Sequence, residues 1–239
     1  MRRRFFVEQF AGTSAVIEGD TAHLLGRVLR AQAGQLYELS DGKRVWLARI
    51  ERVTRDRVEF ALVEEVPADQ SSLDIALLLS IVKFDAFEWA LEKATELGVR
   101  RIVPLTAARS EKGLLSAVGK RAARWNKILM EASQQSRRLQ PPVLEPAAQP
   151  EAAFGAIVAE TKLLLSERRE AASLRQVLGA TNRATTVVLA IGPEGGWTEQ
   201  EFTAARAAGF REASLGKLIL RTETAVIAAL ASLNYAVGD

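Results

Sequence analysis

Residues 185–231, TTVVLAIGPEGGWTEQEFTAARAAGFREASLGKLILRTETAVIAALA, decide the fold of this chain. The apolar run from Val187 to Ile191 has the length and composition of a buried strand, and it stops at the glycine-rich segment 192–196. Thr198 followed by Glu201 forms a capping box, which predicts that a helix begins directly after the loop. The pattern is that of a strand, a glycine loop and a helix.

A second loop follows the same plan. The first helix ends at Gly209, a short apolar stretch runs to Leu215, and Gly216 opens a loop before Thr222 starts a final amphipathic helix. We therefore expect two loops that leave neighbouring strands at one edge of a parallel sheet. Because open α/β sheets bind ligands beyond the carboxyl ends of their strands, the two loops should frame one pocket.

The middle of the chain predicts a unit of strand, helix and strand. Residues 73–80 form a buried-strand run, Asp85 with Glu88 gives a second capping box, and the helix that follows ends at Gly98. Residues 101–105 read as the next strand. A crossover helix between two strands predicts that the sheet is parallel.

The first part of the chain has another character. Short, partly alternating apolar runs up to about residue 67 predict a small β-rich domain, with a hairpin at Asp41-Gly42. One helix, capped by Asp20, carries His23, which we expect to pack or hydrogen-bond rather than to act as a base. The polar segment 66–72 marks a boundary, so we predict domains at 1–70 and 71–239.

The composition excludes several classes of site. The chain has 239 residues, of which 48% are hydrophobic and 26% charged, enough for a sizeable core. It has no cysteine and one histidine, which rules out disulfides, thiolate metal sites and Cys nucleophiles and argues against a Ser-His-Asp triad. No apolar run approaches a bilayer span and no signal h-region is present. We expect a cytoplasmic protein without a membrane or metal partner.

Positive charge gathers between residues 100 and 140, although the formal net charge is only +3. This segment is either a footprint for a polyanion or a solvated helix face, and charge alone favours neither. Its acidic residues are Glu111 and Glu131. Its basic residues are Arg100, Arg101, Arg109, Lys112, Lys120, Arg121, Arg124, Lys127, Arg137 and Arg138.

The two loops lack the known phosphate-binding patterns, since neither a Walker lysine nor the GxGxxG spacing is present. Gly195-Gly196 at a strand end lets the backbone approach a flat ligand closely, although a simple tight turn would use the same residues. In the second loop Arg221 to Thr224 place a guanidinium, a carboxylate and two hydroxyls at a helix start. That combination favours a polar site.

These segments together resemble a known family. GPEGGWTEQE (192–201) and LGKLILRTETAVIAAL (215–230) resemble the C-terminal signature of the RsmE-type 16S ribosomal RNA uracil-N3 methyltransferases, a branch of the SPOUT superfamily. RRFFV (3–7), His23-Leu24 and Val28-Leu29-Arg30 look like the N-terminal RNA-binding, PUA-like domain of that family. KFDAFEWALEKATELGVRRIVPL (83–105), Arg109-Ser110 and EASQQSRR (131–138) look like its middle motifs. The resemblance covers essentially the whole chain.

The resemblance implies an enzyme that uses S-adenosyl-L-methionine, acts on 16S ribosomal RNA or the small ribosomal subunit, and forms a homodimer. It implies an α/β fold: a SPOUT-type parallel sheet with a C-terminal trefoil knot, plus a small PUA-like β-barrel. One position departs, because many relatives carry arginine where this chain has Leu218. The residues expected to bind the cofactor are Leu165, Ser166, Glu167, Ile191, Gly192, Pro193, Glu194, Gly195, Gly196, Leu215, Gly216, Leu218, Ile219, Leu220, Thr224 and Ala225.

Methylation at uracil N3 requires removal of an imide proton and no covalent attack by a thiolate, so a chain without cysteine is consistent with it. Arg221 would stabilise charge on a uracil carbonyl, and Glu223 or Glu194 would accept the proton or fix the loop. Both glutamates serve equally well as caps of helix N-termini. The residues expected to contact RNA are Arg3, Arg4, Arg27, Arg30, Lys83, Arg109, Arg121, Arg124, Arg137 and Arg138.

Two alternatives remain open at this point. One is a SPOUT methyltransferase that acts on another RNA, and the other is a non-catalytic RNA-binding assembly factor.

Overall fold

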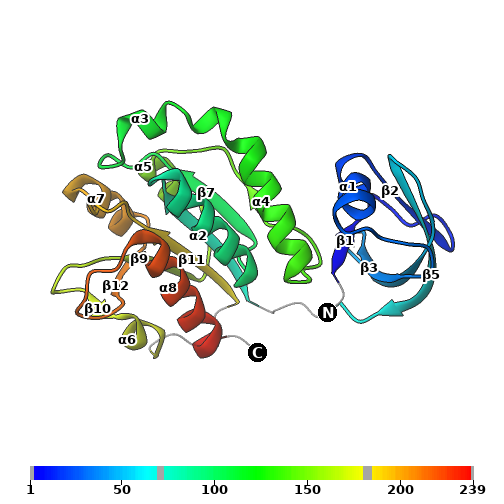
Figure 1. Cartoon of the computed structure of the whole chain (residues 1–239). Coiled ribbons are helices and arrows are strands. Elements are labelled where there is room, and N and C mark those ends of the chain that lie inside the picture. Colours follow the sequence, from blue (N-terminus) through cyan, green and yellow to red (C-terminus); the bar gives the residue numbers. More distant parts are fainter. Residues whose placement is uncertain (1–2, 69–72, 180–184, 238–239) are drawn as a thin grey trace. The chain divides into compact units, whose positions relative to one another are not determined.

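The computed structural model describes residues 3–68, 73–179 and 185–237, which form two compact units (Figure 1). Unit 1 comprises Met1–Gln70 with Ser133–Pro141, and unit 2 comprises Ser71–Ala132 with Pro142–Asp239. The sequence had placed the whole of 71–239 in one domain. The structure differs in the segment 133–141, which packs within unit 1.

Unit 1 is built on a five-stranded sheet in the order β1-β3-β4-β5-β2. All neighbouring pairs are antiparallel except β1 and β3, which run parallel. Its core holds large apolar side chains such as Phe5, Leu39 and Phe60. A closed PUA-like barrel stays a prediction. The strands are β1 (Arg4–Phe6), β2 (Ser14–Glu18), β3 (Leu36–Ser40), β4 (Val45–Val53) and β5 (Arg57–Val66).

The hairpin expected at Asp41-Gly42 is confirmed, since it joins the antiparallel strands β3 and β4. The Asp41 carboxylate accepts hydrogen bonds from the backbone N–H groups of Lys43 and Arg44, at 2.9 and 2.8 Å. Gly42 has a φ of 82°, in the left-handed region that glycine adopts without strain. Burial is the largest single effect on the pKa of Asp41 and raises it. The backbone hydrogen bonds from Arg44 and Lys43 oppose burial, and the net result is a lowered pKa.

The helix of unit 1 begins at a different residue from the one expected. Helix α1 (Gly19–His23) has Glu18 at its N-cap with no side-chain cap, so the prediction that Asp20 caps it was wrong. It continues directly into a π-helix at Leu24–Val28. His23 does hydrogen-bond, because its Nε2 lies 2.9 Å from a carboxylate oxygen of Asp56. Asp56 comes from the turn between β4 and β5, which helical spacing could not reveal.

Residues 133–141 are held in unit 1 by a buried ion pair and two backbone carbonyls. Arg4 donates to the Glu38 carboxylate at 2.9 and 3.1 Å, and also to the carbonyl oxygen of Arg137 at 2.6 Å. The Ser40 hydroxyl donates to the carbonyl of Leu139 at 2.6 Å. Arg4 is only 6% exposed and its guanidinium is engaged in these bonds, which leaves little of it open to RNA, and its expected contact with RNA stays an untested prediction.

Unit 2 is a parallel sheet of seven strands in the order β10-β12-β9-β11-β6-β7-β8. The predicted βαβ unit is confirmed, because β6 and β7 pair in parallel on either side of α2. The strands are β6 (Asp74–Ser80), β7 (Arg101–Leu105), β8 (Val143–Leu144), β9 (Thr161–Leu165), β10 (Ala172–Ser173), β11 (Thr186–Ile191) and β12 (Arg211–Ser214).

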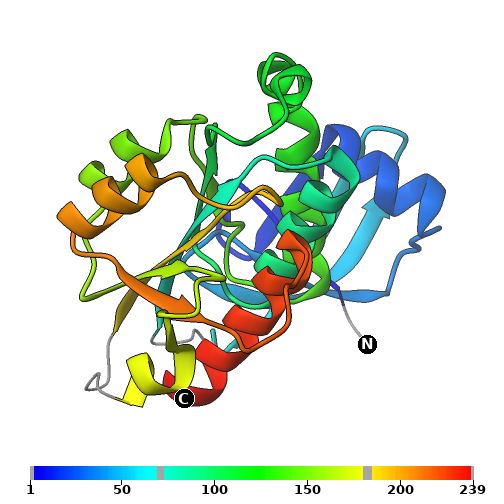
Figure 2. The ribbon, with the colours of Figure 1, turned by 90° about the vertical axis from the view of Figure 1, so that its left-hand side faces the viewer.

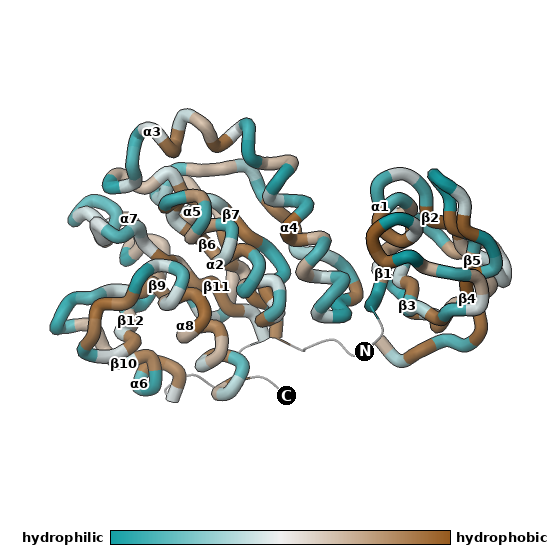
Figure 3. The backbone as a smooth tube through the Cα atoms, viewed as in Figure 1, coloured by the Kyte–Doolittle hydropathy of each residue, from teal (hydrophilic) through white to brown (hydrophobic). Residues whose placement is uncertain are grey.

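Helices cover both faces of this sheet (Figure 2), and Figure 3 shows the apolar residues concentrated along the strands between them. One core lies on the side of α2 and α8, and the other lies on the side of α5 and α7. The helices are α2 (Phe84–Glu96), α3 (Lys112–Leu115), a 3-10 turn (Val118–Lys120), α4 (Ala122–Gln135), α5 (Pro150–Ala156), α6 (Leu174–Gly179), α7 (Glu199–Ala207) and α8 (Thr222–Val237).

The strand order corrects one expectation about the loops. The segments β11 and β12 are not neighbours, because β9 lies between them and pairs with both. Nothing in the sequence indicates that β9 occupies the position between β11 and β12. The loop after β9 therefore lies between the two loops that the sequence singled out. A trefoil knot in this region stays a prediction, and within residues 3–68, 73–179 and 185–237 no helix is long and apolar enough to cross a membrane.

The second capping box, at Asp85 and Glu88, was predicted wrongly. Lys83 is the N-cap of α2 and no side chain caps it. Glu88 is buried and accepts hydrogen bonds from Arg124 Nε at 2.7 and 2.8 Å and from Arg121 Nη1 at 3.3 Å. Two arginines that were expected to bind RNA therefore join α4 to α2.

Glu88→Gln is expected to lower the free energy of unfolding by about 1–2 kcal/mol. The substitution keeps the shape but removes the charge that two guanidinium groups face, and a hydrogen bond to a charged group contributes about 1.5–3 kcal/mol. The arginine side chains are 38% and 63% exposed, which reduces the effect. Urea denaturation measures the change. The matched control is Glu92→Gln on the same helix, expected to change stability by less than about 0.5 kcal/mol; equal effects of the two would contradict this role of Glu88.

Candidate functional site

The loops that follow β9, β11 and β12 line one cavity of about 340 Å³ at the carboxyl edge of the sheet. Its volume lies in the range of small-molecule sites, about 300–1,000 Å³. Its position is the one that open parallel sheets use for ligands. The lining residues are Arg109, Leu165, Ser166, Glu167, Arg168, Ile191, Gly192, Pro193, Glu194, Gly195, Gly196, Trp197, Glu199, Phe202, Ser214, Leu215, Gly216, Lys217, Leu218, Ile219, Leu220, Thr222 and Ala225.

Fifteen of the sixteen residues expected to bind the cofactor lie around this cavity, and Thr224, which is exposed, does not. Their part in binding stays a prediction. Arg109, which was expected to contact RNA, also lies here. Sequence reasoning missed Trp197 and Thr222 although both stand inside the quoted motifs. It also passed over Glu199 of the same motif and Phe202 just after it, and it had no signal for Arg168, which lies outside the quoted stretches.

Trp197 joins the loop after β9 to the loop after β11. Its indole Nε1 donates a hydrogen bond to the carbonyl of Leu165 at 3.0 Å, and the side chain is only 5% exposed. The ring packs so closely on Gly192 that a Cβ placed there would lie 3.0 Å from Trp197 Cε2. Gly192 is therefore required by the indole, whose other contact is an edge-on packing against Phe154.

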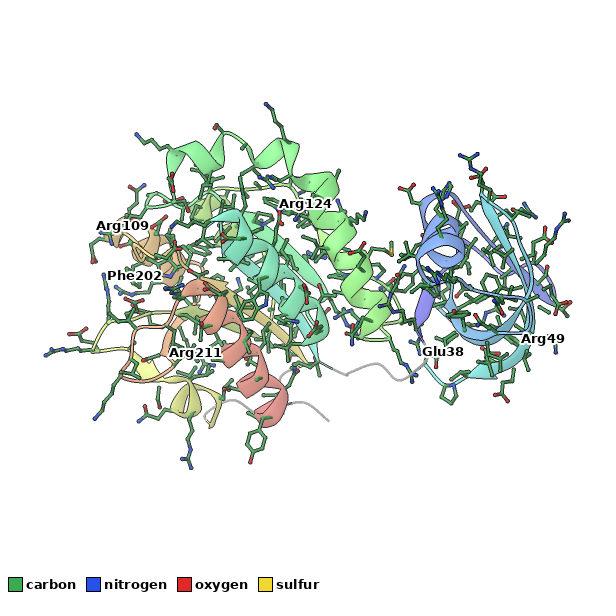
Figure 4. The ribbon with its side chains drawn as sticks, in the orientation of Figure 1. Glu38, Arg49, Arg109, Arg124, Phe202 and Arg211 are labelled. Carbon is green, nitrogen blue, oxygen red and sulfur yellow. The ribbon has the colours of Figure 1, made fainter. Side chains whose placement is uncertain are left out.

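Arg109 supports the same loop from another side (Figure 4). Its Nη1 donates to the carbonyls of Gly195 and Trp197 at 2.8 and 3.1 Å. A Cβ at Gly195 would lie 3.1 Å from Arg109 Cβ, so this glycine admits the arginine side chain. Gly196 has a φ of 69°, in the left-handed region. At Gly195 the structure shows a further reason for glycine, and the expected approach of the backbone to a ligand stays a prediction.

Two further contacts hold the loops together. The capping box at Thr198 and Glu201 is confirmed, and Glu201, 1% exposed, also accepts a hydrogen bond from the backbone N–H of Ala108 at 2.9 Å. Thr222, the first residue of α8, donates from its hydroxyl to the carbonyl of Gly192 at 3.2 Å. The β11 loop is thus tied to three other segments of unit 2, which preorganises the cavity.

A charged pair lies on the rim of the cavity. Arg168 forms an ion pair with Glu199 at the start of α7, and its guanidinium lies 3.6 Å from the centroid of the Phe202 ring. The hydrogen bond with Glu199 raises the pKa of Arg168, so its guanidinium stays charged at neutral pH. Because both partners are engaged, this pair itself adds little free charge to the rim.

The residues predicted to be catalytic are placed apart from this cavity. Arg221 is exposed and Glu223 is half-buried, and neither is among the lining residues. Arg221 nevertheless stands between Leu220 and Thr222, which both line the cavity. Its carbonyl accepts the Ala225 N–H of α8 at 2.9 Å, but its guanidinium makes no hydrogen bond or ion pair with any residue that the structure describes. Its guanidinium is therefore available to an incoming molecule.

The basic residues expected to bind RNA are unequally available. Arg121, Arg124 and Arg137 lie within 4 Å of a carboxylate, of Glu88 for the first two and of Glu38 for the third. Arg27 and Arg30 of unit 1 are exposed, and neither makes an ion pair within the described ranges. Arg30 also has a φ of 49°, which is uncommon for a residue other than glycine.

The chain is similar to known proteins over nearly its whole length. Residues 69–234 match the family model of an RNA methyltransferase domain. The chain is 35% identical to ribosomal RNA small subunit methyltransferase E of Synechocystis over 95% of its own length and 75% of that protein. It is 28% identical to the protein of that name from Aquifex aeolicus, over 96% and 97% of the two chains.

Two solved structures have the same fold across both units. The protein called ribosomal RNA small subunit methyltransferase E from Neisseria gonorrhoeae, bound to S-adenosyl methionine, is 34% identical with a TM-score of 0.89, covering 100% of this chain and 99% of the other. A methyltransferase from Legionella pneumophila with the bound cofactor SAM is 29% identical with a TM-score of 0.91, at the same coverage.

Proposed function

This chain belongs to the family of RNA methyltransferases that contains ribosomal RNA small subunit methyltransferase E, and on that premise we propose that it methylates N3 of a specific uridine in 16S ribosomal RNA with S-adenosyl-L-methionine. The observation that carries the proposal is the cavity of three loops at the carboxyl edge of the sheet. It contains fifteen of the residues that the motifs assigned to the cofactor.

The residues around the cavity fit this cofactor. Glycine-rich backbone at 192–196 offers N–H and C=O groups to the edge of an adenine, and Ile191 and Leu215 offer apolar contact to its faces. Glu167 supplies a carboxylate for ribose hydroxyls. When bound, S-adenosyl-L-methionine supplies a methyl group on a positively charged sulfur. The residues of this chain have to hold that group, exclude water and receive a proton.

The proposal includes a second protomer. Leu218, Ile219 and Tyr235 are 82%, 77% and 94% exposed, and all three belong to the second loop or to α8. Leu218 and Ile219 line the cavity, and large side chains at such exposure favour burial against a partner. We therefore propose that unit 2, which we take as the knotted SPOUT domain, forms a homodimer, and that unit 1 is its PUA-like RNA-binding part. We further propose that the enzyme acts in the cytoplasm.

Arg27→Gln with Arg30→Gln is expected to weaken RNA binding and to reduce the slope of log K against log salt by about 1.5. Each lost phosphate contact removes about 0.7–0.9 from that slope, because fewer counterions are released. Binding of a 16S ribosomal RNA fragment at several salt concentrations measures it. The control is Arg49→Gln with Arg57→Gln, two arginines of unit 1 whose guanidinium groups already face Glu51 and Glu59. Identical slopes for both pairs would remove Arg27 and Arg30 from the RNA interface.

The experiment that tests the function is mass mapping of small-subunit ribosomal RNA after incubation with the enzyme and labelled cofactor. We expect one labelled uridine, whose fragment pattern places the methyl group on N3. Label in another RNA would indicate a related methyltransferase with a different target. RNA binding without label and without calorimetric cofactor binding would indicate an assembly factor.

A further inference from the structure

A second cavity, of about 280 Å³, lies at the end of β6 and adjoins the first. Its lining residues are Ile81, Val82, Lys83, Glu111, Leu114 and Glu194. Glu194 lines both cavities, so they meet at this residue. A methyl transfer needs two molecules whose reacting atoms are in contact, and two adjoining cavities with one shared residue provide that arrangement.

The floor of the second cavity is apolar and fixed. Ile81 and Val82 are 0% and 2% exposed. The N–H of Ile81 donates to the carbonyl of Leu105 at 2.9 Å, and the hydroxyl of Ser110 donates to the carbonyl of Ile81 at 2.8 Å. Ser110 is itself buried, so β6 and the loop after β7 are held together below the cavity. Apolar side chains held in place suit the face of a flat ring.

Hydrogen-bond donors stand at one wall. Lys83 brings an exposed ammonium group, and it is also the N-cap of the thirteen-residue helix α2. No side chain caps this helix, and the first N–H groups of an α-helix have no intrahelical acceptor. They carry partial positive charge toward the cavity edge. The hydrogen-bond acceptors of the cavity are the carboxylates of Glu111 and Glu194.

We propose that this second cavity binds the uracil ring that accepts the methyl group, an inference that rests on the function proposed above. The pairing edge of uracil presents an acceptor, a donor and an acceptor: one carbonyl, N3–H and the other carbonyl. Lys83 and the start of α2 donate to the carbonyls, Glu194 accepts the N3 proton, and Ile81, Val82 and Leu114 contact the ring. Glu111 keeps the Lys83 ammonium near the ring by its negative charge.

The chemical step balances with these groups. The N3 proton passes to the Glu194 carboxylate as the N3 electron pair forms a bond to the methyl carbon. The bond between that carbon and sulfur breaks, and its electron pair stays on sulfur, which becomes a neutral thioether. Negative charge that develops on the uracil carbonyls is stabilised by the Lys83 ammonium. Glu194 then releases the proton to solvent.

The same arrangement selects against cytosine. Cytosine presents an amino donor in place of one carbonyl and carries no proton on N3, so it would face Lys83 with a donor and Glu194 with a lone pair. Such mismatches leave polar groups unpaired, which costs far more than a missing contact in an apolar pocket. Discrimination between the two pyrimidines therefore follows from the residues of the cavity.

The test uses three variants of the full-length enzyme: Lys83→Met, Glu194→Gln and Leu114→Trp. Leu114→Trp fills the cavity, and Lys83→Met removes its ammonium group. Both are expected to reduce the single-turnover methylation rate about a hundredfold or more while the calorimetric Kd for S-adenosyl-L-methionine changes by no more than about twofold. Glu194→Gln is expected to lose the plateau of its pH-rate profile and to gain rate with every rise in pH, because hydroxide must then remove the proton.

A binding measurement accompanies the rates. Uridine 5′-monophosphate and cytidine 5′-monophosphate are titrated by NMR into the enzyme saturated with S-adenosylhomocysteine. Uridine monophosphate is expected to bind the parent more tightly than cytidine monophosphate, and Leu114→Trp is expected to abolish the difference. The control for loss of one positive charge is Arg175→Met, an exposed residue of α6 that lines neither cavity, and it should behave as the parent.

Parental methylation rates in both Lys83→Met and Leu114→Trp would overturn the acceptor site. A loss of cofactor affinity in Leu114→Trp as large as its loss of rate would also overturn it, because the second cavity would then be part of the cofactor site. Failure of the proposed function has another signature: the parent enzyme itself would place its methyl group on an atom other than uracil N3.

Discussion

Trp197→Ala is expected to abolish binding of S-adenosyl-L-methionine and to lower the free energy of unfolding by about 3–5 kcal/mol, the usual cost of truncating a buried tryptophan or phenylalanine. The indole fills the space between Gly192 and Phe154 and holds the Leu165 carbonyl of the neighbouring loop. Without it, two of the three loops around the cofactor cavity lose their connection. Calorimetry measures the affinity and urea denaturation the stability.

Trp197→Phe separates packing from hydrogen bonding. It keeps an aromatic ring against Gly192 but leaves the Leu165 carbonyl without its donor. We therefore expect the free energy of unfolding to fall by about 1–3 kcal/mol. The matched control is Trp89→Ala on α2. Trp89 is 43% exposed, and we expect this variant to bind the cofactor normally. Normal cofactor affinity in Trp197→Ala would show that the loops hold their geometry without the indole.

Arg221→Ala is expected to lose about a hundred- to a thousandfold in turnover while cofactor affinity stays close to the parental value. Arg221 is exposed and its guanidinium has no partner among the described residues, yet its neighbours Leu220 and Thr222 line the cofactor cavity. If its guanidinium stabilises charge on the uracil as N3 loses its proton, the interaction strengthens only in the transition state. Loss of one such donor typically lowers the rate about a hundred- to a thousandfold.

Single-turnover kinetics measures the loss of rate and calorimetry measures the cofactor affinity, both on one preparation of Arg221→Ala. Arg175→Ala controls for the loss of one exposed arginine, and sedimentation shows whether the oligomeric state of Arg221→Ala is unchanged. Glu223→Gln should be less severe, because Glu223 is half-buried at the start of α8. An Arg221→Ala enzyme that keeps the parental oligomeric state and rate would refute the catalytic role.

Two capping boxes show how far local sequence determines local structure. Thr198 and Glu201 form theirs, and the same carboxylate also accepts from the backbone N–H of Ala108, which holds it in place. Asp85 and Glu88 have the same spacing but form none, because Glu88 pairs with Arg124 of a helix that lies 36 residues away. The pattern is equally good in both cases, and a long-range partner decides between them.

The candidate site divides in a similar way. The residues of the three loops were predictable, since strand ends and glycines are visible in sequence and the family motifs name them. The order of the strands was not, because pairing of β9 between β11 and β12 depends on packing along the whole sheet. The roles of Arg109 and Gly195 were also hidden, because their contact joins positions 86 residues apart.

The inclusion of residues 133–141 in unit 1 has a consequence for biosynthesis. The chain passes from unit 1 to unit 2, back to unit 1 and again to unit 2, so three covalent crossings join them. A ribosome that has produced only the five strands of unit 1 has not yet produced the carbonyls of Arg137 and Leu139, to which Arg4 and Ser40 donate. In a nascent chain that ends at residue 70, Arg4 still has Glu38 as an acceptor, but the acceptor of the Ser40 hydroxyl and the second acceptor of Arg4 do not yet exist. Unit 1 reaches its final hydrogen bonding only after more than half of the 239 residues have been synthesised, when most of the βαβ region of unit 2 has already left the exit tunnel.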